Sequence, residues 1–296
     1  MLITMKEMLD RASKENYGVA APNVAHELDA RAVLQAAEMM NAPIILDVAY
    51  GATPDIIFYG KYLTQLADKA AVPVAINLDH GGTYEEGVAA IAAGFTSIMV
   101  DRSTLPYEEN VAQVRELVKV AHALNVSVEA ELGHVGQGAS YAADRDAGLT
   151  KPEQAVQYIK DTGIDMLAVA IGTAHGEYVG TPHIDFDRLV EIKKATNGFP
   201  LVLHGGSGSG DENLKKACQL GINKVNIYTD LAKAAVRQIN EDGIPGMIWK
   251  SITDGIVKQI SYYIELFGGK DKAWKIENKG LGFHEIDTTE KDRKSV

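Results

Sequence analysis

Eight short apolar runs, rich in β-branched residues, alternate along the chain with longer stretches of helical periodicity, and this alternation constrains the fold more than any other feature. Such alternation is typical of a parallel sheet covered by helices. Eight units of this kind most naturally close into a single (β/α)8 TIM barrel, with an open doubly wound sheet as the alternative. The runs cover residues 17–23, 43–48, 74–79, 96–101, 127–132, 166–171, 201–205 and 224–228.

Four segments between these runs are amphipathic and are predicted to be helices: 29–40, 110–124, 152–162 and 211–220. In the second of them the apolar residues recur on one helical stripe. Pro106 and Pro152 stand where helices would begin, and Asp211 is a candidate N-cap.

The chain of 296 residues fits one large α/β domain, predicted to span residues 1–268, and nothing before about Gly268 indicates a linker. Residues 269–296 are polar and charged without clear periodicity, so a C-terminal tail is predicted there.

Charge and cysteine content exclude several classes of protein. The 29 Lys+Arg against 40 Asp+Glu give a formal charge of -11, which argues against nucleic acid or an anionic membrane as partner, although not against an anionic small molecule. Cys218 is the single cysteine, so no internal disulfide forms.

The first ten residues lack the apolar stretch of a signal peptide, and no apolar run is long enough to span a membrane. We therefore expect a cytoplasmic protein.

Polar residues gather where the predicted strands end. In a parallel barrel these ends share one face, and active sites form there. Any one of these residues has an ordinary explanation, such as a helix cap or a satisfied loop histidine. Glu129 and Glu131 point to the same side of their strand, where two buried carboxylates require a cationic partner. The strand ends carry Asn23, Asp47, Asp79, His80, Asp101, Glu129, Glu131, His175, His204 and Asn226.

His80, His175 and His204 are the predicted ligands of a divalent metal, because three protein ligands with a free fourth position are typical of catalytic zinc. Imidazole also suits cobalt, iron or manganese. The glycine-rich turn 205–208 precedes the predicted helix 211–220 and would expose backbone N–H groups that favour a phosphate.

Five blocks of the sequence resemble the class II ketose-bisphosphate aldolases, which include fructose- and tagatose-bisphosphate aldolases. The blocks occur in the family's order and cover residues 75–80, 127–133, 168–176, 201–208 and 224–230. The resemblance implies that His80, His175 and His204 bind a catalytic Zn²⁺, that Asp79 is the acid/base, and that Asp101 and Glu131 hold a second divalent ion or an alternative zinc position. It assigns dihydroxyacetone phosphate to Gly176, Gly205, Gly206, Ser207, Asn226, Ile227, Tyr228 and Thr229. It also implies a homodimer or homotetramer, and Na⁺ or K⁺ near the phosphate.

The chain departs from the family pattern at the aldehyde end. Arg102 stands where relatives usually have a small residue, Tyr228 replaces a smaller or polar one, Val179 lies near a usual lysine, and no arginine lies between Arg237 and Arg293. We therefore keep two hypotheses beside an ordinary bisphosphate aldolase: a different aldehyde half, or an anion contact from Arg102. A metal-dependent sugar-phosphate isomerase or epimerase is a further alternative, and so is a non-catalytic sugar-phosphate-binding barrel. The retained Asp79 and histidines argue against the last.

Overall fold

A closed parallel barrel forms the centre of the protein in the computed structural model, which describes residues 1–137, 148–176, 178, 182–243 and 248–275. A parallel bridge between Asn23 and Asp47 joins the two edge strands, and the Val24 N–H donates to the Asp47 carbonyl at 2.8 Å. The predicted (β/α)8 TIM barrel is therefore confirmed. The strands, in sheet order, are β1 (Val19–Pro22), β10 (Ile222–Ile227), β9 (Leu201–Leu203), β7 (Met166–Val169), β5 (Ser127–Leu132), β4 (Ser97–Val100), β3 (Val74–Gly81) and β2 (Ile44–Ala49).

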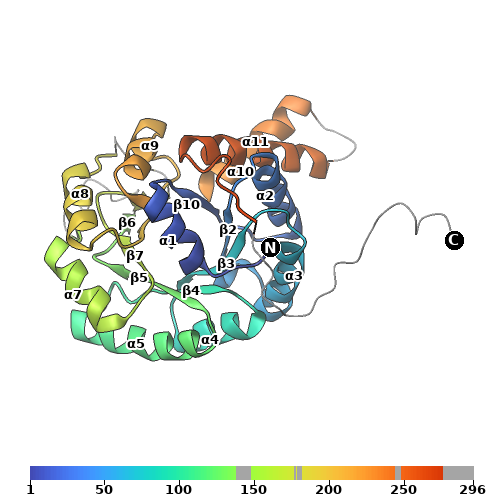
Figure 1. Cartoon of the computed structure of the whole chain (residues 1–296). Coiled ribbons are helices and arrows are strands. Elements are labelled where there is room, and N and C mark those ends of the chain that lie inside the picture. The colour runs from blue at the N-terminus through green and yellow to red at the C-terminus, as the bar shows by residue number, and fades with distance from the viewer. Residues whose placement is uncertain (138–147, 177, 179–181, 244–247, 276–296) are drawn as a thin grey trace.

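Helices surround this barrel, and α1 (Met5–Glu15) lies across the end that faces the viewer in Figure 1. A short 3₁₀ turn, η1 (Tyr50–Ala52), follows β2, and the two-residue strands β6 (Gly136–Gln137) and β8 (Ala174–His175) pair at the opposite end. The outer helices are α2 (Glu27–Met39), α3 (Ile56–Asp68), α4 (Tyr84–Ala93), α5 (Tyr107–Ala123), α7 (Pro152–Thr162), α8 (Phe186–Ala195), α9 (Asp211–Gln219), α10 (Thr229–Asp242) and α11 (Ile248–Leu266).

Local signals explain where several helices begin and end. Thr83 and Glu86 form a capping box at the start of α4, and Gly94 ends that helix in the left-handed conformation. Pro152 occupies the first turn of α7, as predicted. The expected cap of α9 is wrong by one residue: Gly210 is the N-cap and Asp211 is the first helical residue.

One strand boundary differs instructively from its prediction. β10 begins at Ile222, two residues before the predicted start, and the prediction missed these residues because the polar Asn223 interrupts the apolar pattern; Lys224 is a second polar residue in the strand. Both polar side chains are nevertheless fully buried. Lys224 pairs with Glu129 on β5 and Asp47 on β2, and Asn223 accepts from Lys193 on α8. These partners are far away in the sequence, so the local pattern does not reveal them.

The barrel interior changes from apolar to polar along its axis. At the end covered by α1, Met5, Met8 and Leu9 pack against inward-facing apolar side chains such as Ile45 and Ala75. Alternate residues along each strand face inward, so the next inward positions on β2 and β3 are Asp47 and Asn77, both fully buried. This arrangement closes one end of the barrel and leaves the polar end for chemistry.

The segment after α11 runs back along the barrel. The N–H groups of Asp271 and Ala273 donate to the carbonyls of Met40 and Asn41, and the Arg11 guanidinium lies 4.5 Å from the centre of the Trp274 ring. The rest of the predicted tail, residues 276–296, lies outside the described residues. Within the described parts of the chain, no helix combines the length and the apolar character needed to cross a membrane.

Candidate active site

A β-bulge at the end of β3 turns two consecutive side chains into the barrel mouth. Leu78 pairs with Ile98 and Gly81 with Val100, so three steps along β3 match two along β4. His80 has φ 49°, which is unusual for a residue other than glycine. In a regular strand the neighbouring Asp79 and His80 would point to opposite faces. The bulge instead allows both to face the same cavity.

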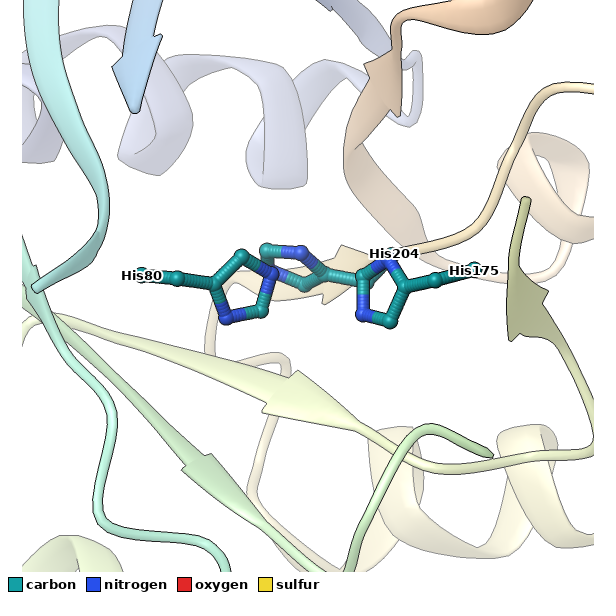
Figure 2. A group of neighbouring side chains, drawn as sticks. All are labelled: His80, His175 and His204. Carbon is teal, nitrogen blue, oxygen red and sulfur yellow. The ribbon is translucent and has the colours of Figure 1, made fainter. Parts of the chain in front are cut away.

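His80, His175 and His204 converge at this mouth, and we call them the three-histidine cluster. Figure 2 shows the rings pointing toward one another from β3, β8 and the end of β9. Ring centres lie 4.6 Å apart for His80 and His204, 4.9 Å for His80 and His175, and 5.8 Å for His175 and His204. One nitrogen from each ring lies within 4.8 Å of the other two. A tetrahedral zinc needs nitrogens roughly 3.4 Å apart, so small side-chain movements would complete such a site.

Carboxylates hold two of these rings from behind. His80 Nδ1 lies 2.8 Å from Asp101 Oδ2, and His204 Nε2 lies 2.8 Å from Glu129 Oε1. The opposite nitrogens, His80 Nε2 and His204 Nδ1, are buried and have no hydrogen-bond partner among the described residues. Metal-bound imidazoles typically donate their other N–H to a carboxylate in this way. The donor set therefore fits a divalent transition metal.

The charges around the cluster also suit a bound cation. Burial and the neighbouring imidazoles lower the pKa of His175 to about 3 and also lower the pKa of His204, which favours the neutral form that binds metals. Burial opposes charge on His80, but Asp79 and Asp101 outweigh it and raise its pKa to about 9. This part of the site thus attracts positive charge.

Asp79 is held as a carboxylate beside the cluster. Asn23 Nδ2 donates to its Oδ2 at 2.8 Å, and Asn226 Nδ2 donates to its Oδ1 at 3.0 Å. Burial opposes ionisation, but His80, His204 and the bond from Asn23 outweigh it and lower the Asp79 pKa to about 2. Its Oδ1 lies 3.8 Å from His80 Nε2, so an ionised carboxylate stands next to the candidate metal position.

Asp101 and Glu131 form a second cluster with His80, and one oxygen or nitrogen from each lies within 4.8 Å of the others. Glu131 Oε1 accepts the Val135 N–H at 2.9 Å, while its buried Oε2 has no partner in the described structure. Burial, reinforced by Asp101, raises the pKa of Glu131 to about 8. The structure therefore brings both predicted carboxylates to His80.

A cavity of about 680 Å³ opens over the three-histidine cluster and Asp79. It extends from the ends of β1 and β2 to the turns after β9 and β10, and its lining includes Ala49, Ala52 and the exposed side chain of Tyr228. The predicted substrate-binding residues all line it: Gly176, Gly205, Gly206, Ser207, Asn226, Ile227, Tyr228 and Thr229.

Tyr178 and Ser207 organise the glycine turn 205–208. The Tyr178 hydroxyl accepts the Ala174 N–H at 2.8 Å and lies 3.1 Å from the Gly205 carbonyl oxygen, to which it donates. Ser207 Oγ accepts N–H bonds from Tyr228 and Asp230 at the start of α10. The turn, the β8 segment and a helix N-terminus are thereby joined into one concave surface.

Gly205 allows this turn to lie against β8. Its φ is 68°, and a Cβ atom at this position would lie 2.3 Å from the Ala174 carbonyl oxygen. We expect Gly205→Ala to lower the free energy of unfolding by about 1–2 kcal/mol through backbone strain and by a further ~1–3 kcal/mol through the steric clash.

Gly198→Ala is the matched control for this prediction, because Gly198 has φ 79° but nothing within 4 Å of its added Cβ. Chemical denaturation of both variants separates strain from clash. Equal losses of stability in the two variants would show that the close approach of the turn to Ala174 is unimportant.

Arg102 does not make the anion contact that its position in the sequence suggested. Its side chain is buried, with Nη1 donating to the carbonyls of Gly81 and Asp101 at 2.9 and 2.7 Å, and Nε donating to Gln113 Oε1 at 2.7 Å. The Gly81 carbonyl also accepts the Asp101 N–H at 3.2 Å. Arg102 does not line the cavity, and its bonds hold the end of β3 and the residue after β4 together.

Sequence reasoning missed three features of the site. Asn23 is a polar strand end in the sequence, but the sequence does not predict its bond to Asp79. Lys224 supplies the cation that Glu129 requires, at 2.7 Å from Glu129 Oε2. His26 also lines the cavity, although only its position after the first strand hinted at this. The departure near Val179 lies outside the described residues, whereas Tyr228 lines the cavity.

Comparisons with known proteins show which family this chain resembles. The family model described as fructose-bisphosphate aldolase class-II matches residues 3–272. A fructose-bisphosphate aldolase of Thermus caldophilus is 42% identical over 309 residues, covering 92% of this chain and 100% of that protein. A probable fructose-bisphosphate aldolase of Bacillus subtilis is 40% identical over 248 residues, covering 81% and 86%.

Among solved structures, the YdjI aldolase from Escherichia coli K12 superposes with a TM-score of 0.83 at 33% identity, covering 93% of this chain and 100% of that one. The family match spans nearly the whole barrel, including every strand end described above. The chain therefore belongs to the class-II fructose-bisphosphate aldolase family.

Proposed function

We propose that this chain is a metal-dependent aldolase that reversibly cleaves a ketose 1,6-bisphosphate, such as fructose or tagatose 1,6-bisphosphate, to dihydroxyacetone phosphate and glyceraldehyde 3-phosphate. The observation that carries the proposal is the position of Asp79, an ionised carboxylate held by two amides beside the three-histidine cluster in an open cavity. Membership of the class-II fructose-bisphosphate aldolase family supports the reaction class.

Zinc is the proposed ion, held by His80, His175 and His204, because three imidazoles with a free fourth position are typical of catalytic zinc. When bound, the ion would act as a Lewis acid for the ketone and adjacent hydroxyl oxygens and stabilise the negative charge that develops during cleavage. Asp101 and Glu131 would hold a second divalent ion or an alternative zinc position together with His80. A Na⁺ or K⁺ near the phosphate, a homodimer or homotetramer, and a cytoplasmic location stay predictions.

The glycine turn and the start of α10 are the proposed site for the phosphate of the dihydroxyacetone half. Ser207 Oγ already accepts two N–H groups at this helix start, and Thr229 begins the helix. Backbone N–H groups at a helix N-terminus favour an anion. A phosphate bound there would place the ketone over the three-histidine cluster.

Asp79 is the proposed acid/base. Its two oxygens each accept one amide N–H, from Asn23 and Asn226, which fixes the carboxylate plane. During cleavage the carboxylate would remove the proton of the C4 hydroxyl as the C3–C4 bond breaks, with the electron pair remaining on the dihydroxyacetone half. During condensation it would return that proton.

One observation favours a second candidate function, cleavage of a ketose 1-phosphate whose aldehyde half carries no phosphate. No lysine or arginine occurs in the cavity lining contributed by the described residues, and the Arg102 guanidinium bonds elsewhere. The end of the cavity formed by Ala49 and Ala52 therefore offers little charge for a distal phosphate.

A substrate panel with coupled detection of dihydroxyacetone phosphate tests both candidates. Fructose 1,6-bisphosphate, tagatose 1,6-bisphosphate and the corresponding 1-phosphates are compared with and without a chelator, and the aldehyde product is assayed separately. Metal-dependent release of both products from a bisphosphate supports the main proposal. Preference for the 1-phosphates supports the second, while interconversion of ketoses without aldehyde release indicates an isomerase or epimerase.

A further inference from the structure

Lys224 lies at the centre of a buried charged network that the proposed reaction does not use. Its Nζ lies 2.7 Å from Glu129 Oε2 and 3.3 Å from Asp47 Oδ2, and all three side chains have 0% exposure. Asp47 in turn accepts a bond from Asn77 Nδ2 at 2.7 Å. The network thus links β10, β5, β2 and β3 beneath the cavity, which Lys224 itself does not line.

Glu129 connects this lysine to a candidate metal ligand. Its two oxygens are divided between partners: Oε2 accepts from Lys224 Nζ, and Oε1 lies 2.8 Å from His204 Nε2. Because a carboxylate is planar and rigid, anchoring Oε2 also determines where Oε1 points. A carboxylate that accepts from Nε2 leaves the lone pair of His204 on Nδ1, the buried nitrogen without a described partner.

The charge of the network also depends on Lys224. Burial would lower the pKa of Lys224, but Asp47, Glu129 and Asp79 outweigh it and raise that pKa above its usual value, so the ammonium stays charged. Apart from Lys224, Arg102 is the only lysine or arginine among the described buried side chains, and its guanidinium bonds the Gly81 carbonyl. Without Lys224, Glu129 Oε2 would have no donor in a dry interior, and the orientation of the carboxylate would be lost.

We propose that Lys224 is a positioning residue: through Glu129 it holds His204 in the orientation and tautomer that present Nδ1 to the metal, and it thereby sets the affinity of the site for zinc. The inference rests on the role proposed above for His204. It assigns no covalent chemistry to Lys224, which is charged and lies below the cavity.

Zinc affinity of the chelator-stripped protein, measured by competition with a chromophoric chelator and without substrate, tests this proposal. We expect Lys224→Met to weaken zinc binding by about 10–100-fold, the usual effect of removing an outer partner of a metal ligand. Lys193→Met is the matched control, because Lys193 is a half-buried lysine that bonds Ser13 and Asn223 near α1. Its variant is expected to bind zinc as the wild type does.

A second substitution separates positioning from simple structural support. In Glu129→Gln the amide has a single acceptor oxygen, and this oxygen would accept the hydrogen bond from Lys224, which can only donate. The NH₂ group would then face His204 Nε2 and force the wrong tautomer, so this variant is also expected to bind zinc weakly. In the double variant K224M/E129Q no donor holds the amide oxygen, which can turn toward His204. The double variant is therefore expected to bind zinc more tightly than E129Q alone.

The inference is overturned if K224M, shown by near-UV circular dichroism to be folded, binds zinc with wild-type affinity. It is also overturned if the fold-loss of zinc affinity in the double variant equals the product of the fold-losses in the two single variants. If K224M does not fold, the zinc affinities of E129Q and the double variant test the inference, and a double variant that binds zinc no more tightly than E129Q contradicts it. A wild-type protein that binds no divalent metal would instead contradict the proposed function, so the two failures remain distinguishable.

Discussion

Replacing Asp79 by asparagine is expected to lower kcat for cleavage by about 10²–10⁴-fold, the range that a general acid/base contributes, while zinc content stays at the wild-type level. The substitution keeps the shape of the side chain but removes the group that is proposed to accept the C4 hydroxyl proton. Asp79 is not among the predicted metal ligands, and His80 and His204 keep their own carboxylate partners in the variant. Steady-state kinetics in both directions and metal analysis of the same preparation check this prediction.

The asparagine also has to fit between two amide donors. Asn23 and Asn226 both donate to Asp79, and an amide side chain can satisfy only one of them through its oxygen. The thermal midpoint is therefore measured alongside the kinetics. Asp10→Asn is the control, because Asp10 is exposed and pairs with Lys6 on α1. A D79N enzyme that is folded, zinc-loaded and within tenfold of wild-type kcat would exclude Asp79 as the base.

Removing His175 is expected to abolish tight zinc binding and to lower kcat/KM by about 10³-fold or more, because a Lewis acid contributes several kcal/mol to such a reaction. His175 is the most informative ligand to remove. His80 bonds Asp101 and His204 bonds Glu129, so removing either histidine would also take a hydrogen-bond partner from a carboxylate. Within the described part of the chain, the His175 ring has no such carboxylate bond, and His175→Ala tests the ligand role alone.

Chelation of the wild-type protein should produce the same loss, and added zinc should restore activity to the wild type but not to the variant. His122→Ala is the control, because His122 bonds Asp165 at the opposite end of the barrel, near Thr4 and Lys6. Full turnover by rigorously stripped wild-type protein would end the metal-dependent proposal, whereas restored turnover in the zinc-treated variant would exclude His175 as a necessary ligand.

Much of the barrel follows from local pattern. Short β-branched runs and amphipathic segments have different periodicities, so their alternation is visible without tertiary information. The helix over residues 152–162 was predicted with its observed bounds, because Pro152 begins it and Gly163 ends it. The helix α1 across the closed end was not predicted, since its role depends on packing under strands that follow it in the chain.

The site residues were predictable for a related reason: strand ends of a parallel barrel share one face, so polar residues at those positions gather. The geometry of the site could not be predicted in this way. The sequence places Asp79 and His80 side by side, and only the bulge in β3 brings both into the cavity. The hypothesis of an anion contact from Arg102 likewise depended on where its side chain lies, and its guanidinium donates to the carbonyls of Gly81 and Asp101 instead of facing the cavity.

By itself, the sequence determined the barrel, the three histidines and the carboxylate beside them, because periodicity and strand ends are local properties of the chain. Only the tertiary structure decided which groups satisfy one another. Lys224 is separated from Glu129 by 95 residues, and Asn226 from Asp79 by 147, yet each pair is bonded inside the barrel. Such pairings depend on which strands become neighbours and on how far each side chain lies along the barrel axis. The local sequence pattern predicts neither.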